Sequence, residues 1–404
     1  MKALTLAFSA LSLVYTSTGA SSVMTTPVLS DIKLLEKAGI PMIARDEATG
    51  VAYAELTPKQ EKQVAEQAHE WRRCGGYEAL PKRPEKAGII ELFAGLRAQD
   101  ARNSAFERNK AQQPKVERNT RVAAALNEVK EEKLSEWVNW FSSFPTRLHS
   151  SATGNDAINA LKTRLEESAK QATFPVQVSL IDHRSTRQKS VRVHIEGAKR
   201  PSEIVVIGGH IDSINHEEGT RAPAPGSDDN ASGSSNLLEA YRILLSQPQP
   251  ERSIEIFWYA GEEAGLLGSA EIAKSYKSAH KDVIGALQLD MTLFPGSGEF
   301  VLGSMTDFTS AWLRAYLVEL NKTYTGAKIV DDKCGYGCSD HASWYRQGFP
   351  SVMPFESTFD DMNHNLHTRR DVVDGKSNFA HSAMFAKLAL AFAMDLGNST
   401  ARAP

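Results

Sequence analysis

Acidic and imidazole side chains follow three apolar segments that the sequence predicts as buried β-strands. These segments are residues 204–207, 253–259 and 283–289. Soon after these segments come five residues whose side chains could bind a metal or transfer a proton: His210, Asp212, Glu262, Glu263 and Asp290. In an open α/β sheet, ligands bind just beyond the carboxyl ends of the strands. Three strands that each deliver such groups to one edge indicate a shared site.

Two loops add further candidates. Asp228 and Asp229 lie in a polar segment just before an expected helix, and His364 and His367 lie before the last helix. Aspartate is a favoured helix cap, but two adjacent aspartates followed by Asn230 are more than a cap needs. We therefore interpret both loops as parts of the same site.

Divalent metal chemistry explains this set of side chains. Zinc binds imidazole nitrogen and carboxylate oxygen, and catalytic zinc sites keep an open position. Two metal ions about 3.5–4 Å apart share a carboxylate and a bridging water, and their charge removes the repulsion between neighbouring carboxylates. Because Glu262 and Glu263 are consecutive, we expect one to bind metal and the other to carry protons.

Short motifs follow one another in a distinctive order along the chain. They are His210-Ile-Asp212, Gly226-Ser-Asp-Asp-Asn-Ala-Ser-Gly233, Ala260-Gly-Glu-Glu263, Leu287-Gln-Leu-Asp-Met291, Cys334-Gly-Tyr-Gly-Cys-Ser-Asp-His341, Met353-Pro-Phe-Glu-Ser357 and Leu366-His-Thr368. In these motifs, over about residues 116–397, the chain closely resembles the secreted bacterial leucyl aminopeptidases, which are dizinc exopeptidases. The resemblance implies two Zn²⁺ per chain and peptide or protein N-termini as substrates.

The resemblance also assigns the metal ligands. It implies that one zinc ion is held by His210 and Asp290. The other would be held by Glu263 and His367, and Asp228 would bridge the two ions.

Further roles follow from the same resemblance. Glu262 would be the general base, and Asp212 would orient His210, as is usual for a metal-bound histidine. Asp229 would follow a cis peptide bond. His364 is the rival of His367 as a ligand, but Leu-His-Thr matches the family motif at His367.

Other histidines and one acceptor motif receive ordinary interpretations. We expect His341 to serve in packing or capping and His216 to lie on the surface. Asn230-Ala-Ser232 fits a glycosylation pattern, but the match is expected to be accidental because it falls in the metal loop.

By family position, an apolar pocket would receive the substrate side chain. Its lining would be Met291, Cys334, Tyr336, Cys338, Phe355, Phe359 and Leu366. Such a pocket suits Leu, Met and aromatic residues, although the same residues would also be ordinary in a core. Met362 stands where relatives often carry Tyr, which leaves the preferred residue open.

Strands and helices alternate beyond about residue 116. The expected strands are 176–181, 191–195, 203–208, 253–259, 283–289 and 351–354, and the expected helices are 122–144, 232–245, 265–275, 309–323, 340–345 and 378–395. This alternation predicts an α/β fold: one globular catalytic domain, residues 111–404, with a central mixed, mostly parallel β-sheet flanked by helices on both faces.

The N-terminal part differs in composition. Residues 1–20 have a lysine, a short apolar run and a small-residue end, which is typical of a signal peptide. Residues 21–110 show no strand pattern and predict a helical, weakly packed pro-segment with an exposed basic stretch at 97–118, to be removed by an activating protease. We therefore expect a protein secreted to the extracellular space or by way of a periplasm.

Composition limits the remaining classes. The 404 residues are 41% hydrophobic and 24% charged with a net charge of −3, which excludes a disordered chain and gives no reason to expect nucleic acid or, after signal removal, a membrane as partner. We expect a monomer. Among three cysteines, Cys334 and Cys338 in Cys-Gly-Tyr-Gly-Cys are either a disulfide or free thiols, and Cys74 would leave with the pro-segment.

Rival functions on the same fold are a single-zinc glutaminyl cyclase, a carboxypeptidase and a non-catalytic ectodomain. A cyclase does not need the complete dizinc set, and an ectodomain would be expected to have lost ligands. A carboxypeptidase would need an Arg or Lys for the terminal carboxylate, and the motifs contain none.

Overall fold

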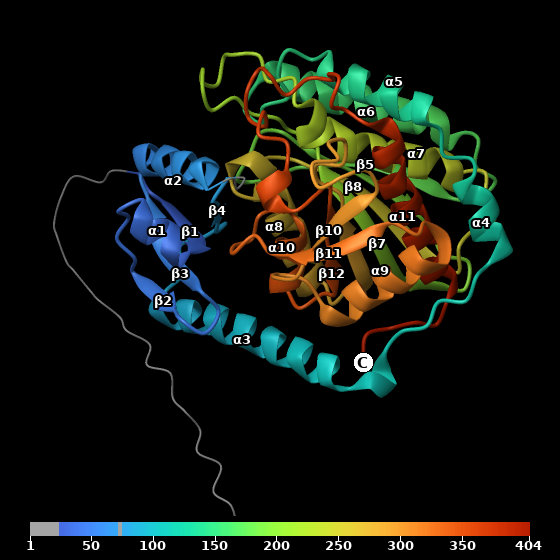
Figure 1. Cartoon of the computed structure of the whole chain (residues 1–404), viewed down its shortest axis with the longest axis horizontal. Coiled ribbons are helices and arrows are strands. Elements are labelled where there is room, and N and C mark those ends of the chain that lie inside the picture. The colour runs from blue at the N-terminus through green and yellow to red at the C-terminus, as the bar shows by residue number, and fades with distance from the viewer. Residues whose placement is uncertain (1–23, 72–74) are drawn as a thin grey trace, which may run out of the picture.

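The computed structural model describes residues 24–71 and 75–404, so the expected signal peptide and Cys74 lie outside the described residues. The chain forms a smaller N-terminal domain, residues 24–108, and a large domain, residues 120–404. In Figure 1 the small sheet and its two helices (blue) lie to one side of the large domain, and helix α3 runs along the edge of the large domain.

The centre of the large domain is a sheet with the strand order β12-β9-β7-β8-β6-β5. The strands are β12 (Ser351–Val352), β9 (Asp282–Gln288), β7 (Arg200–His210), β8 (Arg252–Tyr259), β6 (Ser190–Ile195) and β5 (Val176–Ile181). The first four strands are parallel to one another. Strand β6 pairs with β8, and β5 with β6, in the antiparallel direction. The predicted mixed, mostly parallel sheet is confirmed.

Helices cover both faces of this sheet. Along β7, Val205 and Ile207 face the larger core, whereas Ile204 and Val206 face the other side, because successive side chains of a strand alternate. The first face carries α5 (Glu131–Ser142), α6 (Ala152–Ala169), α7 (Gly233–Leu244) and α11 (Phe379–Asn398), and the second carries α8 (Leu267–Ser278) and α10 (His341–Arg346). Helix α11 is long and apolar enough to cross a membrane, but 78% of that stretch is buried inside the protein.

A second, smaller sheet completes the large domain. It contains β11 (Lys328–Asp332), β10 (Val301–Met305) and β13 (Pro354–Phe355), and α9 (Ala311–Tyr324) joins β10 to β11. Strands β10 and β11 and helix α6 were not predicted from the sequence. The prediction also joined β12 and β13 into one strand, although they belong to different sheets. Three of the five residues of β11 are charged and none of the five is buried, so the strand lacks the apolar run of a buried strand.

The helix predicted over 122–144 is two helices. Helix α4 (Thr120–Leu126) ends at Asn127, and α5 begins after Lys130. The backbone N–H of Lys130 donates to the buried carboxylate of Glu239 at 2.8 Å. This tertiary hydrogen bond fixes the break, which periodicity alone does not reveal.

The prediction of a strand-free, weakly packed N-terminal segment is wrong. An antiparallel sheet of order β2-β3-β1-β4 packs against two helices and has its own apolar core. The elements are β1 (Thr26–Asp31), α1 (Ile32–Lys37), β2 (Ala44–Asp46), β3 (Val51–Leu56), α2 (Pro58–Glu70), β4 (Tyr77–Ala79) and α3 (Lys86–Arg108). Strands of three to six residues are too short to show a clear alternation.

The N-terminal domain also shares a core with the large domain. Leu29, Tyr53 and Phe93 pack in one apolar cluster with Leu266 and Tyr345 of the large domain. Sharing of apolar side chains fixes the position of the smaller domain.

Candidate active site

The carboxyl ends of three parallel strands meet at one edge of the sheet, as predicted. His210 is the last residue of β7, Asp290 follows β9 by two residues, and Glu263 lies in the short turn η3 (Glu262–Ala264) after β8. Nε2 of His210 lies 3.1 Å from Oδ1 of Asp290. Nε2 of His367 lies 2.8 Å from Oε2 of Glu263. The two predicted ligand pairs are therefore brought together.

The carboxylate between the two pairs is Asp229. Its Oδ1 lies 3.0 Å from Nε2 of His210, and its Oδ2 lies 2.9 Å from Nε2 of His367. Two candidate metal groups share it: His210 with Asp229 and Asp290, and Asp229 with Glu263 and His367.

The prediction that Asp228 bridges the two groups is therefore wrong by one position. Oδ1 of Asp228 accepts a hydrogen bond from the N–H of Leu293, and Oδ2 accepts one from the side chain of Asn363. These contacts turn its carboxylate away from His210 and His367. The cis bond is likewise Asp229–Asn230, and not the bond before Asp229. The sequence alone does not show which of two adjacent aspartates points toward the histidines, because this depends on the geometry of the loop.

The loop that carries Asp229 is held by residues that the sequence analysis missed. Asp371 accepts the backbone N–H groups of Asp228 and Asp229, both at 3.0 Å. The fully buried guanidinium of Arg147 donates to the carbonyls of Ile211 and Gly226. Neither residue lies in a recognisable motif, so no local signal in the sequence could have found them.

Asn230 anchors the same loop from inside. It is completely buried, its amide nitrogen donates to the carbonyl of Leu289, and its amide oxygen accepts from the N–H of Gly233. A buried asparagine with these bonds is not a glycosylation acceptor, which agrees with the prediction that the motif match is accidental.

Asp212 positions the turn with the two glutamates. Its carboxylate accepts the backbone N–H groups of Glu262 and Glu263 at 3.0 and 3.3 Å. It also lies 3.5 Å from Nδ1 of His210, and the Asp212 carbonyl is 3.2 Å from the same nitrogen. Asp212 therefore lies where it can orient His210, as predicted, and it also holds the backbone of Glu262 and Glu263.

Burial and crowding set the charge of these acids. Burial, with the nearby negative charge of Asp290, raises the pKa of Glu262 well above its usual range. Burial and the charge of Asp229 raise the pKa of Glu263 to about 7. For Asp229 burial acts in the same direction, but the adjacent imidazoles of His210 and His367 outweigh it and lower the pKa.

The chemistry of the donor set fits divalent cations. Both carboxylate oxygens of Asp229 and of Glu263 are buried and receive no hydrogen bond from the residues that the structure describes. A buried carboxylate oxygen without a donor is costly. Cations bound between His210, Asp229, Glu263, Asp290 and His367 would satisfy these oxygens.

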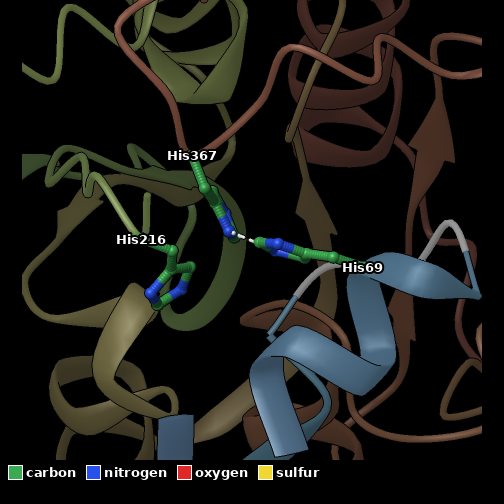
Figure 2. Close-up of side chains that lie close together, drawn as sticks. All are labelled: His69, His216 and His367. Carbon is green, nitrogen blue, oxygen red and sulfur yellow. Dashed lines mark hydrogen bonds between the residues drawn. The ribbon is translucent and has the colours of Figure 1, made fainter. Parts of the chain in front are cut away.

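The structure tests the roles predicted for the remaining histidines. His364 is exposed, whereas His367 is buried against Asp229 and Glu263, so the geometry favours His367 over its rival. His341 is buried at the start of α10, as expected of a packing residue. The prediction that His216 lies on the surface is wrong, because its half-buried ring packs 5.0 Å from the ring of His367. Figure 2 shows two histidines beside His367: His216 of the large domain and His69 of the N-terminal domain.

The predicted pocket residues form one apolar cluster. Met291, Cys334, Tyr336, Cys338, Phe355, Phe359 and Leu366 are all buried and pack together with Met305, Met353 and Met362. The rings of Phe355 and Phe359 stack at 4.7 Å. Met291 directly follows Asp290, so the cluster adjoins the acidic edge of the sheet.

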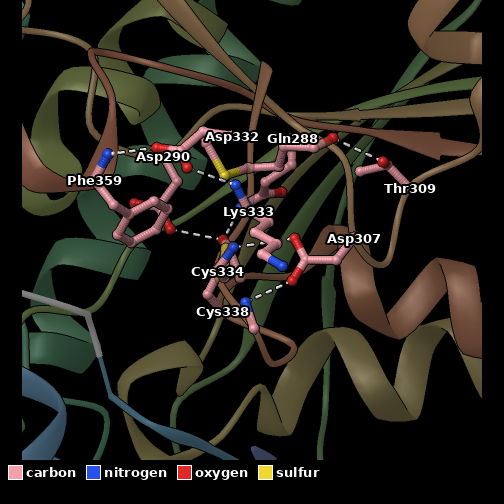
Figure 3. Close-up of a disulfide and its surroundings, with 12 residues drawn as sticks. Gln288, Asp290, Asp307, Thr309, Asp332, Lys333, Cys334, Cys338 and Phe359 are labelled. Atoms are coloured by element: carbon pink, nitrogen blue, oxygen red, sulfur yellow. Dashed lines mark hydrogen bonds between the residues drawn. A yellow bond between two sulfur atoms is a disulfide. The ribbon is translucent and has the colours of Figure 1, made fainter. Parts of the chain in front are cut away.

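A disulfide shapes one wall of this cluster. Cys334 and Cys338 are bonded, which selects the disulfide over free thiols. Asp307 accepts the backbone N–H groups of Cys334 and Gly335 and so anchors the ring (Figure 3). Asp307 was not predicted to contribute to the site.

The N-terminal domain lies directly over the site. Ala79 of β4 donates its N–H to the carbonyl of Gly265 at 3.0 Å. A Cβ at Gly265, where φ is +97°, would lie 2.6 Å from that nitrogen, so the close approach requires glycine. A cavity of about 10 Å³, near the room that one water needs, remains between Gly75, Tyr77, Glu262, Glu263, Tyr336 and Cys338.

A family model described as peptidase family M28 matches residues 190–393, which contain every candidate metal ligand. The chain belongs to peptidase family M28. Members of this family are zinc-dependent. Leucine aminopeptidase 1 of Coccidioides posadasii (strain C735) is 37% identical over 295 residues, or 70% of this chain and 75% of that protein. Leucine aminopeptidase 1 of Arthroderma otae is 38% identical over 289 residues, or 68% of this chain and 76% of that protein.

Solved structures extend the likeness to the N-terminal domain. The LapA aminopeptidase of Legionella pneumophila is 26% identical with a TM-score of 0.75, covering 94% of this chain and 100% of that one. LapB of the same organism has the same fold, with a TM-score of 0.79 at 24% identity, covering 93% of this chain and 100% of that one. This M28 peptidase is accordingly a metalloaminopeptidase. The relatives similar by sequence are fungal, so the bacterial origin in the expected resemblance is not confirmed.

Proposed function

We propose that this chain is a two-zinc aminopeptidase that releases large apolar residues, namely Leu, Met and aromatic residues, from peptide N-termini. The observation that carries the proposal is the pair of ligand groups that share Asp229. One ion would be held by His210 and Asp290 and the other by Glu263 and His367.

The reaction follows from the placement of the glutamates. When bound, the zinc ions supply an activated water and polarise the scissile carbonyl. Glu262 adjoins the ligand Glu263, and Asp212 fixes its backbone. Its carboxylate takes a proton from the attacking water and returns it to the leaving amine.

The preference for apolar residues is supported by the buried cluster next to Asp290. The stacked rings of Phe355 and Phe359 and the side chain of Met291 offer no charge to a substrate side chain. Met362 is also buried in this cluster. A flexible methionine in the wall adapts to several shapes, so we infer a preference for large apolar residues over a single one.

We infer that the chain is made as a latent, secreted precursor. The docked N-terminal domain leaves no room for a peptide between Tyr77 and Glu262. The segment at 113–119 has no regular structure and is mostly exposed, which suits an activating protease. The alternatives of a non-catalytic ectodomain or a glutaminyl cyclase are not favoured. The Porphyromonas gingivalis glutaminyl cyclase shares only the fold, at 16% identity.

The test combines metal counting with a substrate series. The chain is cleaved between its domains and assayed on Leu, Met, Phe, Ala, Lys and Glu amides, before and after chelation. We expect two zinc ions per chain, loss of activity on chelation, recovery with zinc, and the highest kcat/KM for Leu, Met or Phe. An active enzyme without metal would overturn the mechanism. A preference for Lys or Glu would overturn the proposed pocket.

A further inference from the structure

The N-terminal domain reaches the metal ligand His367 with one side chain. His69 lies at the end of α2 (Pro58–Glu70). Its Nε2 is 2.8 Å from Nδ1 of His367 (Figure 2). The two residues are separated by 298 positions in the chain, so this contact exists only because the domains are docked.

The direction of this hydrogen bond follows from the other side of the His367 ring. Nε2 of His367 faces Asp229 and Glu263 at 2.9 and 2.8 Å. An imidazole that gives Nε2 to a metal carries its proton on Nδ1. His367 therefore donates through Nδ1–H, and Nε2 of His69 accepts. A metal-bound histidine commonly donates its second N–H to a partner that fixes ring orientation and raises ligand basicity.

His69 and His216 both lie against the ring of His367, but they contact it in different ways. His69 and His216 pack 4.8 and 5.0 Å from the His367 ring. The backbone N–H of His216 donates to the carbonyl of His367 at 2.9 Å. His216 thus contacts the same ring by packing and through its backbone, whereas His69 makes the side-chain hydrogen bond.

We propose that His69 is a positioning residue that orients the zinc ligand His367 and makes the intact chain hold this zinc ion more tightly than the large domain does alone. The inference rests on the proposed function only for the presence of zinc at His367. It gives the N-terminal domain a second task besides covering the site, namely to retain the metal until the precursor is activated.

Thermodynamic linkage gives this proposal a reciprocal form. If docking tightens zinc binding, zinc binding must tighten docking by the same factor. The N–H of Ala79, which bonds to the carbonyl of Gly265 across the interface, reports on docking by its hydrogen exchange. We expect chelation to speed this exchange in the wild-type chain and to have less effect in His69→Ala.

A third cation held by the histidines is the competing interpretation. One ligand nitrogen each from His69, His216 and His367 lies within 4.8 Å of the others. Such a site would need Nδ1 of His367 without its proton while Nε2 already serves the catalytic edge. The hydrogen bond needs no such deprotonation, and the observations favour it.

The experiment measures zinc in the full-length chain. Wild type, His69→Ala, His69→Gln and His216→Ala are saturated with zinc, dialysed and counted by elemental analysis, and zinc release to a chromophoric chelator is then followed. We expect two ions in each protein. One of the two ions should bind about 10–100-fold more weakly in His69→Ala. His69→Gln should restore tight binding, because its side-chain oxygen accepts the same hydrogen bond, and His216→Ala should resemble wild type.

Each other result decides against the proposal in its own way. Equal release from wild type and His69→Ala would overturn it, as would equal weakening in His216→Ala, which would indicate packing alone. Three ions in wild type and two in both alanine variants would show a three-histidine cation site. A wild-type chain that binds no zinc would contradict the proposed function itself.

Discussion

The two domains contribute to the site in different ways. Every candidate ligand and the candidate base lie in the large domain, where Asp212, Asp371 and Arg147 fix the backbone around them. The N-terminal domain meets this edge through a few contacts: His69 with His367, Ala79 with Gly265, and Glu78 with Arg346. The large domain therefore holds the candidate catalytic residues, and the N-terminal domain covers the edge where they lie.

The largest expected effect isolates chemistry from metal binding within the large domain. Glu262→Gln keeps the size of the side chain but cannot take up a proton, so we expect kcat to fall by about 10²–10⁴-fold with zinc content unchanged. Glu263→Gln is the matched neighbour and should lose zinc as well. Activity assays with elemental analysis check both. Substantial turnover by Glu262→Gln would remove it as the base.

A second pair of neighbours tests the corrected bridge. Asp229→Asn should weaken both zinc ions, because Asp229 lies between His210 and His367. Asp228→Asn should retain both, since its carboxylate bonds to Leu293 and Asn363 instead. We expect a loss of metal affinity of about 10-fold or more for Asp229→Asn alone. Equal losses in the two variants, measured by competition with a chelator, would refute the assignment.

Separation of the domains tests the division of labour directly. A specific protease site placed in residues 112–115 allows the folded chain to be cut and the N-terminal domain removed. We expect activity to rise, by about tenfold for each 1.4 kcal/mol of docking free energy lost. The uncut chain with the same insertion is the control. Unchanged activity after verified removal would show that the N-terminal domain does not limit access.

How much the sequence could predict also differs between the domains. In the large domain, long apolar strands such as β8 and their acidic ends were sufficient to predict the central sheet and most of the site. The choice between Asp228 and Asp229 was not accessible, because it depends on a loop held by Asp371 and Arg147 from distant parts of the chain.

In the N-terminal domain the local signal was weaker. Strands β2 and β4 contain three residues each, too few for periodicity to distinguish from a loop. Their stability comes from pairing with β3 and β1 and from packing on the large domain. The contact of His69 with His367 joins the two domains and has no counterpart in any local motif.

A buried ion pair crosses the interface, and its loss should loosen docking. Glu78 of β4 pairs with Arg346 of α10, and both side chains are nearly inaccessible. Glu78→Gln leaves the guanidinium buried and unpaired, at a cost of about 3–5 kcal/mol. We expect basal activity of the uncut chain to rise. Glu36→Gln, which removes an exposed pair with Arg45, should cost about 1 kcal/mol or less and leave activity unchanged. Equal activities of the two variants would contradict a role in docking.

The smallest expected effect concerns the pH dependence of stability without metal. Burial raises the pKa of Glu263 and of Asp340 to about 7, so between about pH 4.5 and 7 the folded chelated chain binds more protons than the unfolded chain. Stability must then fall as the pH rises through this window. The raised pKa of His210, in which burial is outweighed by Asp290 and Glu262, acts in the same direction. The lowered pKa of Asp229 acts only below the window.

Zinc should suppress this dependence, because cations keep the carboxylates ionised in the folded chain. Thermal unfolding at about pH 5 and pH 8 should therefore show a lower Tm at the higher pH for the chelated chain and a smaller drop for the zinc-loaded chain. Glu263→Gln removes one of the titrating acids and should flatten the chelated profile. If the Tm of the chelated chain rose with pH instead, Glu263 and Asp340 would not be the buried acids that take up protons on folding. The free energy that the metal-free site costs would then have to come from other residues of the large domain.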